Sequence, residues 1–252
     1  MTTDTKLKQF TATWQLTAGQ TDAQGLMPLP LVVARAIEAA TLHANALAIG
    51  YSDLATRRLG WVLARLGIRM HRYPRINESY CIDTWIEGYN RFFSDRCYAM
   101  YTPEGEPLAD IRSQWVAIDT DTRRMADLSE LERDSFPTQD RPCPVPRLSR
   151  PAIAPGCTPD EAAYTFTYCD IDFNRHVNIV RYLEAVLNTR PLEFYDTHRA
   201  SELEMSFERE CHFGQTVRLL TGPSRSGAAD GLVTDIICPD GARAVGIRLV
   251  FI

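Results

Sequence analysis

The sequence predicts an α+β protein made of two successive units, each an antiparallel sheet curled around one central helix. Three observations carry this prediction: a proline-rich stretch past the middle of the chain, a motif that recurs on both sides of it, and the same order of apolar periodicities in both halves. With 252 residues, 45% of them hydrophobic and 23% charged, the chain has the composition of an ordinary globular protein. It is long enough to bury one large core or two small ones.

The proline-rich stretch runs from Pro137 to Pro159 and shows neither helical nor strand periodicity. Proline has no backbone N–H and a fixed φ angle, so it interrupts helices and central strands. We therefore expect a semi-extended linker at residues 137–159, between a first domain at residues 1–136 and a second domain at residues 160–252.

A short segment of the first half recurs in the second half at a separation of 150 positions, 172 minus 22. Asp22-Ala-Gln-Gly-Leu-Met-Pro aligns with Asp172-Phe-Asn-Arg-His-Val-Asn. Each segment follows a strand-like run rich in Thr and aromatic residues, at residues 10–17 and 164–168, and each precedes an amphipathic helix. The pattern indicates an internal duplication.

The two helices are predicted from apolar residues spaced three and four apart, which give each helix one apolar stripe. Pro28 fits the opening turn of the first helix, and Asn178 is a candidate N-cap of the second. The stripes consist of Leu29, Val32, Val33, Ala36, Ile37 and Ala40 in the first half, and of Ile179, Tyr182, Leu183, Val186 and Leu187 in the second.

After each helix the apolar period changes to two, which is typical of strands. An antiparallel sheet with one apolar face needs cover, and a single striped helix per half supplies it if the sheet curls around that helix, which is the hot-dog architecture. Exposed sheet edges would then pair within the chain or in a homodimer. The expected strands are residues 61–70, 80–87, 91–101 and 107–118 in the first half, and residues 203–207, 217–221, 232–238 and 242–251 in the second.

Composition excludes several classes of function. The seven cysteines are scattered, without a C-x-x-C pair or clustering with His, so neither a disulfide framework nor a zinc site is indicated. The net charge of -5 argues against a nucleic-acid partner. We expect no membrane span and no secretory signal in the first eight residues, and hence a cytoplasmic protein.

The densest polar cluster is the segment at residues 168–178, between a strand and the start of the second helix. It brings Asp172, Asn174 and His176 within five residues, next to unpaired N–H groups at a helix start. Such a cluster could stabilise a developing oxyanion and move a proton. The same residue types also make turns and caps, so this second interpretation stays open.

The cluster resembles the catalytic loop of the acyl-acyl-carrier-protein (acyl-ACP) thioesterases of plants and bacteria. The motif Asp-x-Asp-x-Asn-x-His-Val-Asn at residues 170–178 and the segment Phe-Glu-Arg-Glu-Cys at residues 207–211 carry the resemblance. Residues 72–75, 83–85 and 115–124 resemble further landmarks of that family, so the similarity covers most of the chain.

The resemblance implies a fold of two hot-dog domains and the hydrolysis of fatty acyl thioesters, with no metal or organic cofactor. It also implies a hydrolytic network of Asp172, Asn174, His176 and Glu210, with Cys211 as a contested further member. In one route a carboxylate-held water attacks the thioester, and in another a carboxylate itself attacks. Because Gln24 and Leu26 replace Asn174 and His176 in the first half, we expect one active site per chain.

An older alternative makes Cys211 the nucleophile of a Cys-His-Asn triad. If the strand that begins at Leu203 stays regular, Cys211 faces the apolar side and Glu210 the opposite side. Strand parity therefore favours Cys211, although a bulge or turn near residues 212–215 could reverse this assignment. Glu210 is favoured on the resemblance alone.

The implied partner is an acyl carrier protein with a phosphopantetheine-linked acyl chain. Because this carrier is acidic, arginines would be expected near the pocket mouth. An acyl-coenzyme A thioesterase of the same fold and a non-catalytic acyl-binding protein are the alternatives. The sequence does not determine the preferred acyl chain length. The candidate arginines are Arg72, Arg75, Arg123, Arg124, Arg147 and Arg175.

Overall fold

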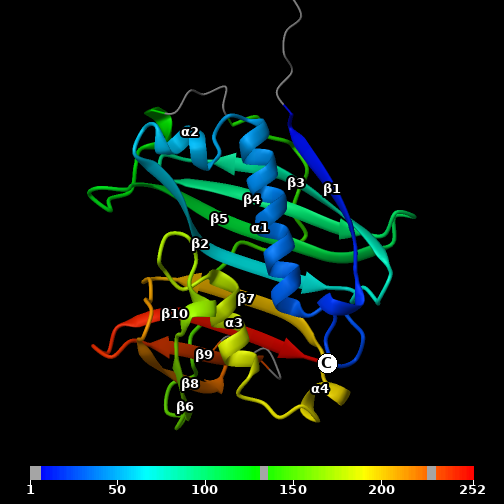
Figure 1. Ribbon diagram of the computed structural model, residues 1–252, viewed down its shortest axis with the longest axis vertical. Coiled ribbons are helices and arrows are strands. Elements are labelled where there is room, and N and C mark those ends of the chain that lie inside the picture. Colours follow the sequence, from blue (N-terminus) through cyan, green and yellow to red (C-terminus); the bar gives the residue numbers. More distant parts are fainter. Residues whose placement is uncertain (1–6, 131–135, 226–230) are drawn as a thin grey trace, which may run out of the picture. The chain divides into compact units, whose positions relative to one another are not determined.

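The computed structural model describes residues 7–130, 136–225 and 231–252. The chain divides into two compact units, one of residues 1–28 and 32–147 and the other of residues 29–31 and 148–252 (Figure 1). The first six residues, part of the segment in which we expect no secretory signal, lie outside the described part.

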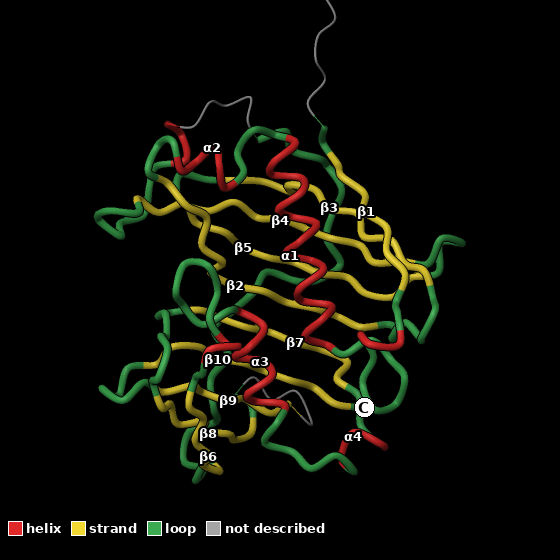
Figure 2. Tube along the Cα trace, in the orientation of Figure 1, coloured by secondary structure: helices red, strands yellow, loops and turns green. Residues whose placement is uncertain are grey.

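In its described residues, the first unit contains one long helix and five strands. A 3-10 turn at Ala18–Gln20 precedes the long helix, and a short helix follows it (Figure 2). The elements are β1 at Gln9–Gln15, α1 at Leu29–Ala46, α2 at Tyr51–Ala55, β2 at Leu59–Met70, β3 at Ser79–Tyr89, β4 at Phe93–Tyr101 and β5 at Pro107–Asp119.

The second unit repeats this order with shorter elements. A 3-10 turn at Tyr168–Asp170 precedes its main helix, as Ala18–Gln20 does in the first unit. The elements are β6 at Asp160–Thr165, α3 at Ile179–Leu187, α4 at Phe194–Thr197, β7 at Ala200–Phe207, β8 at Thr216–Pro223, β9 at Gly231–Ile237 and β10 at Arg243–Phe251.

The two units share one sheet topology. Strands in the first unit follow the order β1-β3-β4-β5-β2, and those in the second follow the equivalent order β6-β8-β9-β10-β7. The ladders between neighbouring strands within each unit are antiparallel. The β9–β10 hairpin turns at Gly241, whose φ of 84° is readily accessible to glycine. The internal duplication expected from the motif is thus confirmed in the order of the strands.

Each long helix buries its predicted stripe. Val32, Val33 and Ala36 of α1 are fully buried, as is Leu183 of α3. Burying one such aliphatic side chain stabilises the fold by about 1.5–3 kcal/mol, so the stripes fix each helix against its sheet. Asn178 caps α3 by accepting a hydrogen bond from the Val180 N–H at 3.1 Å, as predicted.

A buried polar pair joins α1 and β4 inside the first unit. Arg96 donates to Nδ1 of His43 at 2.8 Å and to the Thr84 hydroxyl at 3.2 Å. Because Nδ1 accepts, the imidazole is neutral and its Nε2–H donates to the Leu7 carbonyl at 2.8 Å. Burial, with the nearby guanidinium, lowers the pKa of His43 to about 4.

One feature differs from the sequence expectation. The first strand of the second unit ends at Thr165, and Tyr168 lies in a 3-10 turn, so the strand expected at residues 164–168 is misplaced. Residues of the proline-rich stretch make backbone contacts with each unit. The Trp85 indole donates to the Arg141 carbonyl at 2.9 Å, and the Ala154 N–H donates to the Pro223 carbonyl at 2.8 Å.

No helix in the described part of the chain combines the length and the apolar character that crossing a bilayer requires.

Candidate functional site

The second unit brings His176 and Glu210 together. His176 lies in the loop before α3, Glu210 in the segment after β7, and His176 Nδ1 is 3.4 Å from Glu210 Oε1. Both side chains are only partly buried, at 24% and 36% exposure, so a substrate can reach them. A backbone hydrogen bond of 2.9 Å from Val177 N–H to the Cys211 carbonyl holds the two segments side by side.

Asp172 shapes the loop that carries His176. Its Oδ1 accepts from the backbone N–H of Asn174 at 2.9 Å and of His176 at 3.1 Å. Its own N–H donates to the His176 carbonyl at 2.8 Å. The carboxylate therefore fixes the backbone on which the imidazole is mounted, a contact that Asx turns typically make.

The first unit contains the same loop without the imidazole. Asp22 Oδ1 accepts from the N–H of Gln24 and of Leu26, each at 3.0 Å, and the Asp22 N–H donates to the Leu26 carbonyl at 2.8 Å. Asp22 makes these bonds although its loop carries no histidine. The same bonds of Asp172 therefore form the loop whether or not Asp172 takes part in catalysis. The alternative role in turn formation thus holds for Asp172, alongside any role in a reaction.

Asn174 is exposed beside His176 on this loop. Its side chain is not used to hold the loop, because the bond to Asp172 comes from its backbone N–H. The amide side chain is therefore open to solvent, and its part in the predicted network stays a prediction.

Cys211 is fully buried. Its Sγ lies 3.7 Å from Sγ of Cys238, and its N–H donates to the Tyr182 hydroxyl at 2.9 Å. Burial raises the pKa of the Cys211 thiol to about 12. The thiol is therefore protonated near neutral pH and packs as a small core side chain.

The strand does not stay regular as far as Cys211, because β7 ends at Phe207, so the condition for the parity argument is not met. Residues 208–215 form an irregular segment, in which Cys211 turns inward and Glu210 lies near His176. Cys211 nevertheless lies on the apolar side, as strand parity predicts. That position separates the thiol from solvent, whereas Glu210 stays within reach of the imidazole.

His212 was not singled out from the sequence. Its ring centroid is 5.1 Å from that of His176, with the two rings nearly edge to face at 68°. A signal was present, because the chain has only five histidines and one of them comes two residues after Glu210. The strand pattern ends before this segment, so periodicity could not indicate where the ring points.

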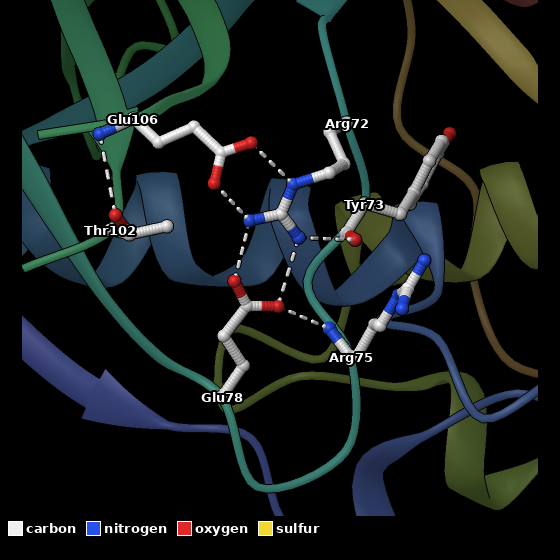
Figure 3. A network of polar contacts seen from close by, with 6 residues as sticks. All are labelled: Arg72, Tyr73, Arg75, Glu78, Thr102 and Glu106. Atoms are coloured by element: carbon white, nitrogen blue, oxygen red, sulfur yellow. Dashed lines mark hydrogen bonds and ion pairs between the residues drawn. The ribbon is translucent and has the colours of Figure 1, made fainter. Parts of the chain in front are cut away.

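Arg72, one of the arginines expected at a basic rim, is already paired. Its guanidinium contacts Glu78 at 2.6 Å and Glu106 at 2.7 Å, and Glu78 also accepts from the Arg75 N–H (Figure 3). The hydrogen bond from Arg72 lowers the pKa of Glu78. Arg72 therefore stabilises the turn before β3 and is unsuited to bind an acidic partner.

Among the residues that the structure describes, no three His, Cys, Asp or Glu side chains come together in an arrangement that could hold a metal ion.

Comparison with known proteins accounts for both units. The family model for the N-terminal domain of acyl-ACP thioesterases matches residues 7–134, and the model for the C-terminal domain matches residues 157–245. The chain belongs to the acyl-ACP thioesterase family. This membership confirms the resemblance drawn from the motifs at residues 170–178 and 207–211.

A solved acyl-ACP thioesterase from Bacteroides thetaiotaomicron is similar over nearly the whole chain. It shares 27% identity with a TM-score of 0.88, covering 97% of this chain and 98% of that one. This likeness confirms the α+β fold of tandem hot-dog domains for this family member.

Two plant relatives differ in the acyl group that their names give. Oleoyl-acyl carrier protein thioesterase 1 of Arabidopsis thaliana is 30% identical over 73% of this chain. Dodecanoyl-[acyl-carrier-protein] hydrolase of Cinnamomum camphora is 27% identical over 79% of it. The chain spans 55% of the length of each of these two relatives.

Proposed function

We propose that this acyl-ACP thioesterase family member hydrolyses fatty acyl thioesters of acyl carrier protein to a free fatty acid and the carrier, ending acyl chain synthesis. The observation that carries the proposal is the His176–Glu210 pair at 3.4 Å, which lies within the residues that match the C-terminal family model. The organisation into domains at residues 1–136 and 160–252, joined by residues 137–159, is part of the same proposal.

In the proposed reaction, Glu210 accepts from Nδ1–H of His176 and so leaves Nε2 as the base. His176 takes a proton from water, which attacks the thioester carbonyl carbon. The Asn174 amide stabilises the oxyanion of the tetrahedral intermediate. The intermediate collapses by breaking the carbon–sulfur bond, and the thiolate that leaves needs little acid assistance because an ordinary thiol has a pKa of about 8.5.

In this scheme Asp172 positions the imidazole through the loop, and Cys211 lies outside the chemistry. A protonated, buried thiol is a poor nucleophile. The irregular segment after β7 instead leaves Glu210 partly exposed beside His176. Direct attack by the Glu210 carboxylate remains the competing route, and trapping an acyl anhydride would favour it.

The test is hydrolysis of one acyl group carried on acyl carrier protein or on coenzyme A. We expect faster turnover of the carrier-protein ester, and a loss of about 100-fold or more in His176→Ala and Glu210→Gln. His71→Ala is the matched control, because His71 Nε2 pairs with Asp110 Oδ2 at 2.8 Å in the first unit. Equal turnover by wild type and His176→Ala would contradict the mechanism, and faster turnover of the coenzyme A ester would favour the second candidate.

A further inference from the structure

Arg175 adopts a backbone conformation that favours glycine. Its φ is 64°, and the equivalent position in the first-unit loop is Gly25, with a φ of 72°. The two loops otherwise match, since the N–H of Arg175 donates to the Asp172 carbonyl at 3.0 Å and that of Gly25 to the Asp22 carbonyl at 3.1 Å. A Cβ is disfavoured in this region, so arginine at this position carries a local steric cost.

The backbone alone does not single out Arg175, because Arg58 and Arg123 in the first unit also have a positive φ, of 55° and 59°. The difference lies in the side chains. The guanidinium of Arg58 pairs with Asp121 at 3.0 Å. Arg175 is exposed, and within the described ranges its guanidinium makes no hydrogen bond or ion pair with the rest of the chain.

Two exposed aromatic side chains lie on the segments that carry the candidate site. Phe173, two residues earlier, is 73% exposed, and Phe213 in the segment after Glu210 is 67% exposed. Backbone hydrogen bonds join this segment to the loop region, from the Val177 N–H to the Cys211 carbonyl at 2.9 Å and from the Gly214 N–H to the Phe166 carbonyl at 2.8 Å. An exposed cation and exposed rings thus border the candidate site.

We propose that Arg175 is a substrate-binding residue whose guanidinium pairs with the phosphate of a phosphopantetheine arm, a proposal that rests on the function proposed above. The arm joins a thioester to a phosphate through a linker of methylene, dimethyl and amide groups. The exposed rings suit the apolar part of this linker, and a planar guanidinium suits the phosphate oxygens.

The arm has a suitable length. From sulfur to phosphorus it is about as long as a four-residue extended chain, roughly 14 Å. A thioester at His176 therefore places its phosphate well outside the reach of the imidazole. The side chain of Arg175, whose Cα is about 3.8 Å from that of His176, adds its own length to this separation, so its guanidinium can meet a phosphate that the imidazole cannot reach. The same arm is present in carrier protein and in coenzyme A.

The test compares acyl-4′-phosphopantetheine with acyl-pantetheine, which differ only in the phosphate. We expect wild type to prefer the phosphorylated ester by about threefold to fivefold in kcat/KM, the range for an exposed charge pair, and this preference to fall as salt is added. Arg175→Gly should remove the preference without lowering the melting temperature, because glycine suits the backbone. Arg175→Lys should keep part of the preference, and Arg58→Gly should keep all of it.

Equal kcat/KM for the two esters in wild type, or a preference that survives in Arg175→Gly, would overturn the proposal. If the wild-type protein hydrolyses neither of these esters nor the acyl thioester of acyl carrier protein, the proposed function is wrong instead. Measuring Arg175→Gly on acyl carrier protein and on acyl-coenzyme A then identifies the source of the arm, because kcat/KM falls more on the carrier whose phosphate the guanidinium contacts.

Discussion

Because the loop is duplicated, two matched substitutions, Asp172→Ala and Asp22→Ala, can distinguish an effect on stability from an effect on hydrolysis. Each removes a carboxylate oxygen that accepts two backbone N–H bonds, at 2.9 and 3.1 Å for Asp172 and at 3.0 Å twice for Asp22. Bonds to a charged acceptor are worth about 1.5–3 kcal/mol when buried and less when half-exposed, so we take about 1 kcal/mol for each. Each variant should therefore lose about 2 kcal/mol.

For a chain of this size such a loss lowers the melting temperature by about 4–8 °C, which thermal unfolding can measure. Hydrolysis, measured well below the transition, should fall by about 100-fold or more only in Asp172→Ala, because only that loop carries His176. Asp172→Asn keeps an oxygen acceptor and should retain more activity than Asp172→Ala if the carboxylate acts by positioning. Wild-type hydrolysis by Asp172→Ala, or an equal loss in Asp22→Ala, would refute this reasoning.

Three further predictions concern buried groups. Cys211→Ala should hydrolyse substrate at the wild-type rate per folded molecule, because burial raises the pKa of the Cys211 thiol to about 12. Loss of hydrolysis in a rate assay would instead indicate that Cys211 is the nucleophile. His43 takes up a proton below pH 6.5 in the unfolded chain, but only below about pH 4 in the folded chain. The free energy of unfolding, measured by chemical denaturation, should therefore fall by up to about 3 kcal/mol as the pH drops from 6.5 to 4. The variant His43→Gln should lose this pH dependence. In Gly246→Ala, the new Cβ would collide with an Arg243 nitrogen that pairs with Asp235 at 2.9 Å, so this ion pair must break. Denaturation should show that the free energy of unfolding falls by about 2 kcal/mol. An unchanged denaturation midpoint would contradict this prediction.

Much of the fold was predictable because it depends on local periodicity. The stripes of α1 and α3, the alternation along the later strands and the recurrence of the loop motif are all properties of neighbouring residues. The strand expected at residues 164–168 failed for a related reason. Thr and aromatic residues favour strands, but the Thr167 N–H bonds to Asp170 at 2.7 Å and starts a 3-10 turn.

The candidate site divides in the same way. Sequence spacing alone brings Asp172, Asn174 and His176 together, because they share one loop. It could not decide between Glu210 and Cys211, since strand parity holds only while a strand stays regular, and β7 ends at Phe207.

The sequence by itself thus determined two copies of one sheet-and-helix unit, the polar loop in the second copy and the family to which the chain belongs. Only the tertiary structure decided that Cys211 is buried, that Glu210 and His212 lie near His176, and that Arg72 is occupied by Glu78 and Glu106. The physical reason is that periodicity reports which face a residue takes within its own element. Contacts between separate segments depend on where each element ends and how the chain turns there.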